Sequence, residues 1–337
     1  MGRGRLTSAG RRLALARVRL TVRAIAIDEF GGNDRLELKD VADPKLGPDG
    51  VLIRIRGAGL NPVDHKIREG SLDAAFPHVF PLVLGWDAAG VVEAVGPAVV
   101  RFAPGDEVFA YCRKHFVGEG TYGEYVVVPE DFAAPKPESI DFVRASAVPL
   151  AALTAWQALV EATAVRAGET VLVHGAAGGV GAFAVQIARA RGAQVIGTAS
   201  SAKHDFLRDL GASEQIDYTE VDFVEAVRDS HPDGIHVVFD LFGGDTLRRS
   251  VDALADGGRI VSLAEPPVDD HFRQREIKPA YVFVRPSGSQ LAELSRLIDG
   301  GEIRVELEAS YPLAEAAQAL ERLETGRVQG KLALELE

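Results

Sequence analysis

An apolar run, a cluster of glycines and an amphipathic run follow one another in VLVHGAAGGVGAFAVQIA, residues 171–188. The first three residues predict a short buried strand, and the spacing of the later apolar residues predicts a helix with one apolar face. That face consists of Val180, Ala184, Ile187 and Ala188. The glycines between strand and helix stand at 175, 178, 179 and 181. A turn with so little side chain leaves N–H groups uncovered at a helix N-terminus, which favours a phosphate.

The alternation of strands and helices continues after this segment. We expect further strands at QVIGTA, HVVFDLFG, GRIVSLA and AYVFV, and helices near 203–210 and 245–254. Continuous apolar strands that alternate with helices predict a parallel sheet covered on both faces. Helical patterns near 288–299 and 313–325 and a final strand, KLALEL, follow it.

Residues 22–150 have a different pattern, in which short β runs are broken by Gly and Pro. The runs are RAIAI, VLIRIRGAG, AAGVVEAVG, DEVFAY and GEYVVVP. Such runs are typical of a barrel or sandwich. A helical, Ala-rich pattern between Ser146 and Ala162 marks the change between the two halves. We therefore expect an α/β protein with a β-rich domain and a doubly wound parallel-sheet domain, which 337 residues can supply.

Composition excludes several classes of protein. With 47% apolar and 26% charged residues the chain is typical of soluble globular proteins, and no apolar stretch approaches the roughly 20 residues that span a bilayer. The net charge of −12 argues against a nucleic-acid partner. The single cysteine, Cys112, excludes an internal disulfide and a Cys-rich zinc cluster. Because nothing indicates an oxidising compartment, we expect the protein in the cytoplasm.

The first residues differ from the rest of the chain. Residues 1–23 contain no acid and seven arginines, and acid-free segments rich in Arg and Ser resemble transit peptides. The globular chain is nevertheless expected to start near Val22, because the segment before it has no periodic apolar face. We expect residues 1–21 to be a disordered extension or the product of a misplaced start, and their deletion to leave fold and activity intact.

The region about 20 residues after the glycine turn indicates the cofactor. An acid there commonly bonds the ribose hydroxyls and selects NAD. Here the second strand ends in GTASSAKHD, with Ser200, Ser201 and Lys203 at that place. Small hydroxyls and a cation suit a 2′-phosphate, so the sequence predicts NADP(H), although a solvated lysine at a helix start is the alternative for Lys203. Ala176 departs from the G-x-G-x-x-G pattern at its first glycine.

Four motifs in order resemble one known family. They are GLNPVDHKIREG, PLVLGWDAAGVVEAVG, PGDEVFA and GAAGGVGAFAVQIARARGAQVIGTAS. Together they resemble the medium-chain dehydrogenase/reductase superfamily, and within it the zinc-independent quinone oxidoreductase branch related to zeta-crystallin. The resemblance runs from about residue 22 to the C-terminus. It implies a GroES-like catalytic domain (22–148 and 287–337) around a Rossmann NADP-binding domain (149–286), with the active site between them.

The resemblance makes the metal-ligand positions informative. Zinc-dependent members carry a Cys near the start of the motif that reads NPVD here, a His-Glu pair after a glycine, and a later Cys. This sequence has Asn61 at the first place and Trp86 and Asp87 after Gly85 at the second, and PLAALTAW near the third has no thiol. Trp offers only an N–H donor and a neutral amide is a poor zinc ligand, so we expect no metal. One alternative is a site made from Asp64, His65 and His78.

The resemblance also implies roles for single residues. Asn61 approaches the nicotinamide-ribose side of the cofactor, and Asp64 orients its loop. Candidate proton donors are His65, Lys66 and Tyr111, with solvent as an alternative, whereas His115 and His174 are expected to be non-catalytic. The expected catalytic residues are Asn61, Asp64, Lys66 and Tyr111. The expected cofactor-binding residues are Asn61, Thr154, Gly178, Gly179, Val180, Gly181, Ser200, Ser201, Lys203, Tyr218, Phe242, Gly243 and Leu263.

Without a metal, alcohol oxidation loses its usual Lewis acid. We therefore expect NADPH-dependent hydride transfer to a quinone or an α,β-unsaturated carbonyl. The alternatives are a zinc-free alcohol or aldehyde reductase and a non-catalytic, crystallin-like NADPH-binding protein. The family resemblance also implies a homodimer, which we expect to form through the sheet edge near 280–284, because an unpaired apolar edge strand would invite aggregation.

Overall fold

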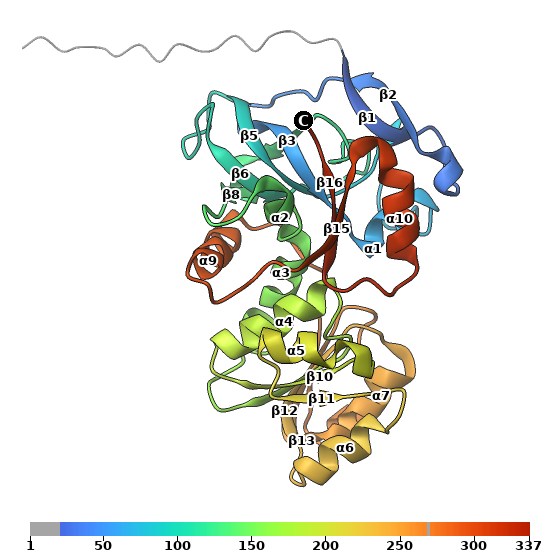
Figure 1. The fold of residues 1–337 in the computed structure, drawn as a ribbon, viewed down its shortest axis with the longest axis vertical. Helices are drawn as coiled ribbons and strands as arrows, with labels where there is room; N and C mark the ends of the chain where they lie inside the picture. The colour runs from blue at the N-terminus through green and yellow to red at the C-terminus, as the bar shows by residue number, and fades with distance from the viewer. Residues whose placement is uncertain (1–20, 268–269) are drawn as a thin grey trace, which may run out of the picture.

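The computed structural model describes residues 21–267 and 270–337. The expected extension, residues 1–21, lies outside this range except for Thr21. Figure 1 shows two parts stacked along the long axis of the molecule. The upper part contains most of the first strands together with β15 and β16, the lower part contains a second sheet, and α3 and α4 lie between them.

The upper part is built on two sheets. One has the order β2-β1-β4, and the other has the order β15-β16-β3-β5-β6-β8 with β7 paired to β3. Their strands are β1 (Thr21–Ile27), β2 (Glu37–Ala42), β3 (Gly50–Gly59), β4 (Leu82–Val83), β5 (Asp87–Val95), β6 (Glu107–Tyr111), β7 (Tyr125–Pro129), β8 (Ala133–Pro135), β15 (Leu307–Pro312) and β16 (Lys331–Glu335). Ala333 of β16 lies opposite Gly59 of β3. The last strands of the chain, β15 and β16, therefore belong to the same sheet as β3, β5, β6 and β8.

The lower part is one parallel sheet of six strands in the order β11-β10-β9-β12-β13-β14. The strands are β9 (Thr170–Val173), β10 (Gln194–Thr198), β11 (Glu214–Ile216), β12 (Ile235–Asp240), β13 (Leu254–Ser262) and β14 (Lys278–Tyr281). Counted from β9 this is the order 3-2-1-4-5-6 of the Rossmann fold. Ligands of such sheets bind where the order reverses, at the carboxyl ends of β9 and β12.

Ten α-helices connect or cover the sheets within the described residues. They are α1 (Pro62–Arg68), α2 (Phe142–Ser146), α3 (Pro149–Trp156), α4 (Gly179–Ala190), α5 (His204–Leu210), α6 (Phe223–Ser230), α7 (Gly244–Ala253), α8 (Asp270–Gln274), α9 (Gly288–Asp299) and α10 (Ala316–Glu324). The Ala-rich α3 is almost entirely buried and packs against α4 and α9. Small side chains let these helices approach closely, so α3 links the two parts of the molecule.

The elements differ from the sequence expectations in a few places. The larger sheet of the upper part includes β15, for which the sequence pattern predicts no strand. β14 ends at Tyr281, three residues before the end of the strand expected over 280–284. The short polar strand β11 and helix α6 had not been expected.

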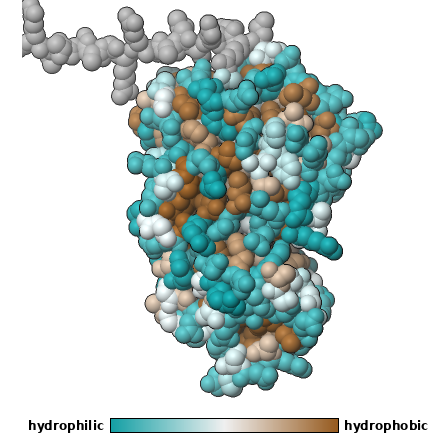
Figure 2. All heavy atoms as spheres, viewed as in Figure 1, coloured by the Kyte–Doolittle hydropathy of each residue, from teal (hydrophilic) through white to brown (hydrophobic). Residues whose placement is uncertain are grey.

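Most of the described surface is hydrophilic on the face seen in Figure 2. On the face seen in Figure 2, apolar side chains gather in a hollow near α2 and α3, and in a smaller patch near α6. Among the described residues, no helix has both the length and the apolar character that crossing a bilayer would require.

Candidate active site

The glycine turn lies at the carboxyl end of β9, where the strand order reverses. Gly178 is the N-cap of α4, and its N–H donates to the carbonyl of Gly175 at 3.0 Å. The first N–H groups of a helix have no partner within the helix. The donors available to a phosphate are therefore those of Gly179, Val180 and Gly181, whereas the N–H of Gly178, also expected to face the phosphate, is used by the turn itself.

The glycines of the turn serve different purposes. A Cβ on Gly181 would lie 2.3 Å from the carbonyl oxygen of Gly175, so Gly181 permits helix and turn to touch. A Cβ on Gly179 would lie 2.8 Å from Cδ of Lys331, which places the Lys331 side chain across the start of α4. At Gly178 the nearest atom would be 3.4 Å away. Space for a ligand therefore exists at Gly178, while Gly181 is needed for packing.

The N-x-x-D motif forms the start of α1. The carboxylate oxygen Oδ2 of Asp64 accepts hydrogen bonds from the Asn61 backbone N–H and from the Tyr122 hydroxyl, both at 2.8 Å. Its other oxygen, Oδ1, is buried and has no hydrogen-bond partner in the described part of the chain. Asp64 therefore fixes the loop that presents Asn61.

A buried polar chain runs from Lys331 through Asn61 to Asp87. The Lys331 ammonium donates to Oδ1 of Asn61 and to the Leu60 carbonyl, both at 2.5 Å. The Asn61 amide Nδ2 donates to Asp87 at 2.8 Å, and the second oxygen of Asp87 accepts the N–H of Leu150 at 2.8 Å. These two contacts fix the orientation of the Asn61 amide. If its oxygen and nitrogen were exchanged, the NH₂ group would face the Lys331 ammonium, and both groups are donors. One N–H of Nδ2 stays available. We call Lys331, Asn61 and Asp87 the buried triad.

Burial dominates the electrostatics of this region. It raises the pKa of Asp64 to about 7, opposed by the hydrogen bonds from Asn61 and Tyr122. It raises the pKa of Asp87 to about 6, opposed chiefly by the positive charge of Lys331. Burial lowers the pKa of Lys331, while Asp87 and Asp64 raise it. The protonation of this region is therefore expected to change near neutral pH.

The expected proton donors lie in different surroundings. Lys66 is exposed on α1. His65 is half-buried, burial lowers its pKa, and its Nδ1 has no partner. Tyr111 stands opposite Asp87 in the β5–β6 pairing, so both side chains point to the same face. Among the described residues its buried hydroxyl has no acceptor, and burial raises its pKa, opposed by the nearby Arg113. Of the three, Tyr111 adjoins the buried triad.

The expected 2′-phosphate region lies after β10. Ser200 is the N-cap of a short 3-10 helix that includes Ser201 and Lys203. The Lys203 ammonium donates to the carbonyls of Arg327 and Val328 at 3.2 and 3.5 Å, which leaves it one further proton. The backbone N–H of Ser201 donates to Asp217 at 2.7 Å.

Asp217 is an acid that the sequence argument overlooked in this region. Hydrogen bonds from Thr219 hold its pKa at about 2, so a negative charge stands beside the place assigned to a phosphate. Tyr218 follows it and is exposed, as is expected of a residue that would cover a ligand.

The remaining expected cofactor residues gather around the carboxyl end of β12 or lie on α3. Asp240, the last residue of β12, accepts the N–H of Gly243 at 2.9 Å, and its carbonyl accepts the N–H of Leu263 at 3.3 Å. Phe242 is exposed, and its ring lies 3.0 Å from where a Cβ of Gly175 would be. On α3, the Thr154 hydroxyl donates to the Leu150 carbonyl at 2.7 Å and keeps its lone pairs for a ligand.

Other candidate chemistry falls outside this region. Among the described residues, no three His, Cys, Asp or Glu side chains come together where they would hold a metal ion. His174 lies between the hydroxyls of Ser250 and Thr198, and burial lowers its pKa to about 3, so its imidazole stays neutral. Burial raises the pKa of Cys112, which keeps its thiol protonated.

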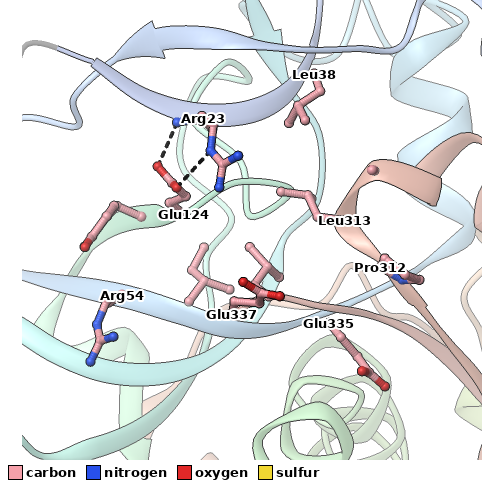
Figure 3. Close-up of a pocket in the computed structure, with 12 residues that line it drawn as sticks. Arg23, Leu38, Arg54, Glu124, Pro312, Leu313, Glu335 and Glu337 are labelled. Atoms are coloured by element: carbon pink, nitrogen blue, oxygen red, sulfur yellow. Dashed lines mark hydrogen bonds and ion pairs between the residues drawn. The ribbon is translucent and has the colours of Figure 1, made fainter.

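A surface groove of about 600 Å³ lies between β1, β3 and β16, away from the glycine turn. Arg23, Arg54 and Glu335 are among its lining residues (Figure 3). Arg23 is held by Glu124 through its backbone N–H at 2.9 Å and its side chain at 3.2 Å (Figure 3). None of the expected site residues lines this groove, so the site is assigned from the contacts around Asn61 and not from the groove.

Three residues of the site were missed by sequence reasoning as functional positions: Asp87, Tyr122 and Lys331. A lysine at the start of the apolar run KLALEL and an aspartate just before AAGVV were the available signals, because charges beside buried strands need partners. Their partner lay far away in the sequence, so the pattern alone did not connect them.

Comparison with known proteins agrees with this architecture. Residues 47–138 match the alcohol dehydrogenase GroES-like domain, and residues 210–334 match the zinc-binding dehydrogenase family. The chain belongs to the quinone oxidoreductase branch of the medium-chain dehydrogenase/reductase superfamily. It is thus an oxidoreductase of a family that uses a nicotinamide cofactor.

Similar proteins cover nearly the whole chain. Quinone oxidoreductase of Mus musculus is 34% identical over 314 residues, which cover 89% of this chain and 93% of the relative. The chloroplastic NADPH-dependent alkenal/one oxidoreductase of Arabidopsis thaliana is 37% identical over 320 residues, which cover 92% and 78%. The structure of the quinone oxidoreductase from Coxiella burnetii superposes with a TM-score of 0.84 at 34% identity, covering 94% and 100%.

Proposed function

We propose that this protein transfers a hydride from NADPH to a quinone or an α,β-unsaturated carbonyl without zinc. The observation that carries the proposal is the buried triad at the start of α4, where the Lys331 side chain meets the glycine turn. A neutral amide with one free N–H stands there, next to helix donors suited to a phosphate. The names of the relatives support the same chemistry.

The residues of the chain fit the proposed cofactor. Gly179, Val180 and Gly181 would bind the pyrophosphate through backbone N–H groups, which the α4 dipole assists. Ser200, Ser201 and Lys203 would bind the 2′-phosphate, and Tyr218 would cover it. Thr154, Phe242, Gly243 and Leu263 would line the nicotinamide half.

The groups around the triad do the positioning. When bound, NADPH supplies the hydride. Asn61 would donate its free N–H toward the nicotinamide-ribose side, held by Lys331 and Asp87, while Asp64 fixes the loop. Because burial keeps the Tyr111 hydroxyl protonated, Tyr111 would donate a hydrogen bond to the substrate oxygen as negative charge develops on it. Lys66 stays a weaker candidate proton source because it lies exposed on α1.

The zinc-free part of the proposal rests on residue types. Asn61 and Trp86 stand at family positions that supply zinc ligands in other members, and neither suits zinc. We expect purified protein to carry no stoichiometric zinc and chelators to leave activity unchanged. About one tightly bound zinc per chain would refute this part alone.

The function is tested by following NADPH consumption against a panel of quinones, enones and aldehydes. Quinones or enones are expected to be reduced with higher kcat/KM than aldehydes. Preference for aldehydes would favour the alternative of a zinc-free alcohol or aldehyde reductase. NADPH binding without turnover of any acceptor would favour the crystallin-like alternative.

We also propose a homodimer that forms through β14. This strand is the edge of the six-stranded sheet, and its last residue, Tyr281, is exposed. Exposed aromatic residues on an edge strand invite pairing. Light scattering at micromolar concentration should give twice the mass of one chain, and a monomeric mass would contradict this assembly. Location in the cytoplasm and the domain limits 22–148, 149–286 and 287–337 stay predictions.

A further inference from the structure

Five side chains next to the buried triad form a closed cycle of ring contacts, which we call the aromatic cage. Its members are Phe76, Trp86, Tyr111, Arg113 and Phe283. The ring centroids of Trp86 lie 5.7 Å from Phe76 and 6.2 Å from Tyr111. The Arg113 guanidinium lies 6.0 Å from the centre of the Tyr111 ring and 5.2 Å from that of Phe283. The Phe283 and Phe76 centroids, 6.0 Å apart, close the cycle.

The cage joins the two parts of the molecule. Trp86, Tyr111 and Arg113 come from β5, β6 and the residues beside them, whereas Phe283 follows β14 of the parallel sheet. Arg113 also donates to the carbonyl of Val284 at 3.4 Å. Because Tyr111 shares a face with Asp87, the cage adjoins the side of the site that holds Asn61. An acceptor bound in the cage would thus lie next to the proposed hydride donor.

Two polar groups of the cage lack partners. Within residues 21–267 and 270–337, the Tyr111 hydroxyl and Nε of Arg113 are buried and donate no hydrogen bond, although the Arg113 side chain lies close enough to the Tyr111 hydroxyl to oppose the rise of its pKa. No ion pair joins Arg113 to a carboxylate within residues 21–267 and 270–337. By contrast, the neighbouring Lys114 is paired with Glu119. Buried donors are normally satisfied, so the two unpartnered donors indicate a ligand that supplies acceptor atoms.

We propose that the aromatic cage binds a flat electron acceptor that carries an acidic group, and that Arg113 selects that group. The inference rests on the proposed function and narrows its substrate class to aromatic enones or quinones with a carboxylate or similar anion. Aromatic side chains favour a planar ring, and a guanidinium binds a carboxylate with two parallel hydrogen bonds. A local cation is needed because the chain as a whole is acidic, with a net charge of −12.

The test uses two ligands of the same shape, 2-naphthoate and the neutral 2-naphthamide, whose binding is measured by calorimetry in the presence of NADPH. The wild-type protein is expected to bind 2-naphthoate about ten- to hundred-fold more tightly, the range for a charge-assisted hydrogen bond. Arg113→Gln should bring the ratio of the two affinities close to one. Lys114→Gln is the matched control, with the same charge change one residue away, and should keep the wild-type ratio.

Each result decides the inference. A wild-type ratio near one would overturn it, and so would an equal fall of the ratio in both variants, because that would show a general effect of charge. If Arg113→Gln does not fold, Arg113→Lys replaces it and should keep part of the preference. Failure of the proposed function can be told apart from failure of this inference. In that case the enzyme would not reduce neutral 4-phenylbut-3-en-2-one with NADPH, but it would still bind 2-naphthoate more tightly than 2-naphthamide.

Discussion

The ammonium of Lys331 lies 2.5 Å from Oδ1 of Asn61, and both side chains are almost fully buried, at 5% and 2% exposure. This contact orients the Asn61 amide at the proposed cofactor site. It also supplies the positive charge that offsets the buried carboxylate of Asp87.

Replacing Lys331 by Met should therefore impair both stability and cofactor use. Lys331 and Asp87 are joined through Asn61, and a buried charge left uncompensated costs about 3–5 kcal/mol. We expect a loss of this size in the free energy of unfolding in denaturant, and a rise in KM for NADPH. Lys331→Gln, which keeps a donor for Asn61, should recover part of the KM. Lys278→Met, at an exposed position, is the control, and equal losses in both Met variants would contradict the role of Lys331.

The buried carboxyl of Asp64 should make stability fall as pH rises. Its pKa is about 7 in the folded protein against 3.8 as the ordinary value, so between these values the folded state holds a proton that the unfolded state has lost. The free energy of unfolding then falls with rising pH by up to about 1.4 kcal/mol per unit for this group. Asp87, with a pKa of about 6, adds to the slope in the same direction up to that pH.

The measurement is the denaturant midpoint at several pH values between 5 and 7.5. Asp64→Asn is expected to flatten the slope. Asp217→Asn should not, because the pKa of Asp217 is already about 2 and its charge is constant in this window. A wild-type midpoint that rises with pH would show that Asp64 is not buried as a neutral acid.

Lys203→Ala should lower the affinity for NADPH relative to NADH. The ammonium of Lys203 keeps one proton after its bonds to Arg327 and Val328, and NADH has no 2′-phosphate to receive it. A charge-assisted hydrogen bond corresponds to about ten- to hundred-fold in affinity. Fluorescence titration with both cofactors measures the ratio. Equal weakening of both, or a wild-type preference for NADH, would refute the assignment of NADPH.

Asp217→Asn should act in the opposite direction. Its carboxylate accepts the N–H of Ser201, so a negative charge stands close to the expected phosphate. Its removal is expected to raise the ratio of NADPH to NADH affinity a few-fold, with a smaller effect at high salt because exposed charges are screened. A fall in the ratio would mean that Asp217 organises the phosphate site and does not repel its ligand.

Gly181→Ala should destabilise the protein, whereas Gly178→Ala should not. A Cβ at 181 would meet the Gly175 carbonyl at 2.3 Å, while at 178 the same oxygen is 3.4 Å away and the backbone is extended, with φ −81° and ψ −179°. Overpacking of this kind costs about 1–3 kcal/mol. Thermal unfolding of the two variants compares them directly. Equal melting temperatures would contradict the packing role of Gly181.

Gly178→Ala is then the informative variant for the cofactor. Its methyl group would enter the space where a phosphate approaches, so binding should weaken while the fold stays intact. A substitution at Gly181 is less informative about the cofactor, because the first atoms that its side chain meets are those of the turn itself.

Local patterns were enough to predict much of the fold. The helices expected near 203–210 and 288–299 correspond to α5 and α9. They were predictable because apolar residues recur at helical spacing in both segments. β11 was missed because its three residues, EQI, are mostly polar and only half-buried at the sheet edge. How the first strands combine into sheets depends on pairings between distant residues, such as Gly59 with Ala333. No local pattern in the sequence contains such a pairing.

Residues of the candidate site could be predicted where they belong to one local motif. Contacts between residues that lie far apart in the sequence could not. The N-x-x-D motif lies at the start of α1 and the glycine turn at the start of α4, while the roles expected for Asn61 and Asp64 stay predictions. Lys331 could not be connected to Asn61 because only the β16–β3 pairing brings them together. Asp217 was overlooked because it follows the third strand of the sheet, which itself had not been expected.

The distance along the chain between Asn61 and Lys331, 270 positions, also governs how the site arises during translation. At about 5–20 residues per second, roughly 15 to 55 s pass between the synthesis of these two residues. All of β9 to β14 lies within that interval, and among the residues that the structure describes these strands pair with one another. The parallel sheet, which is the proposed nucleotide-binding part, can therefore fold on the ribosome before Lys331 has been synthesised. Until then Asn61 and Asp87 lack the ammonium group that contacts Asn61 in the finished protein. Under the proposed function, the cofactor could bind before β16 has been synthesised, whereas reduction of a substrate could begin only afterwards.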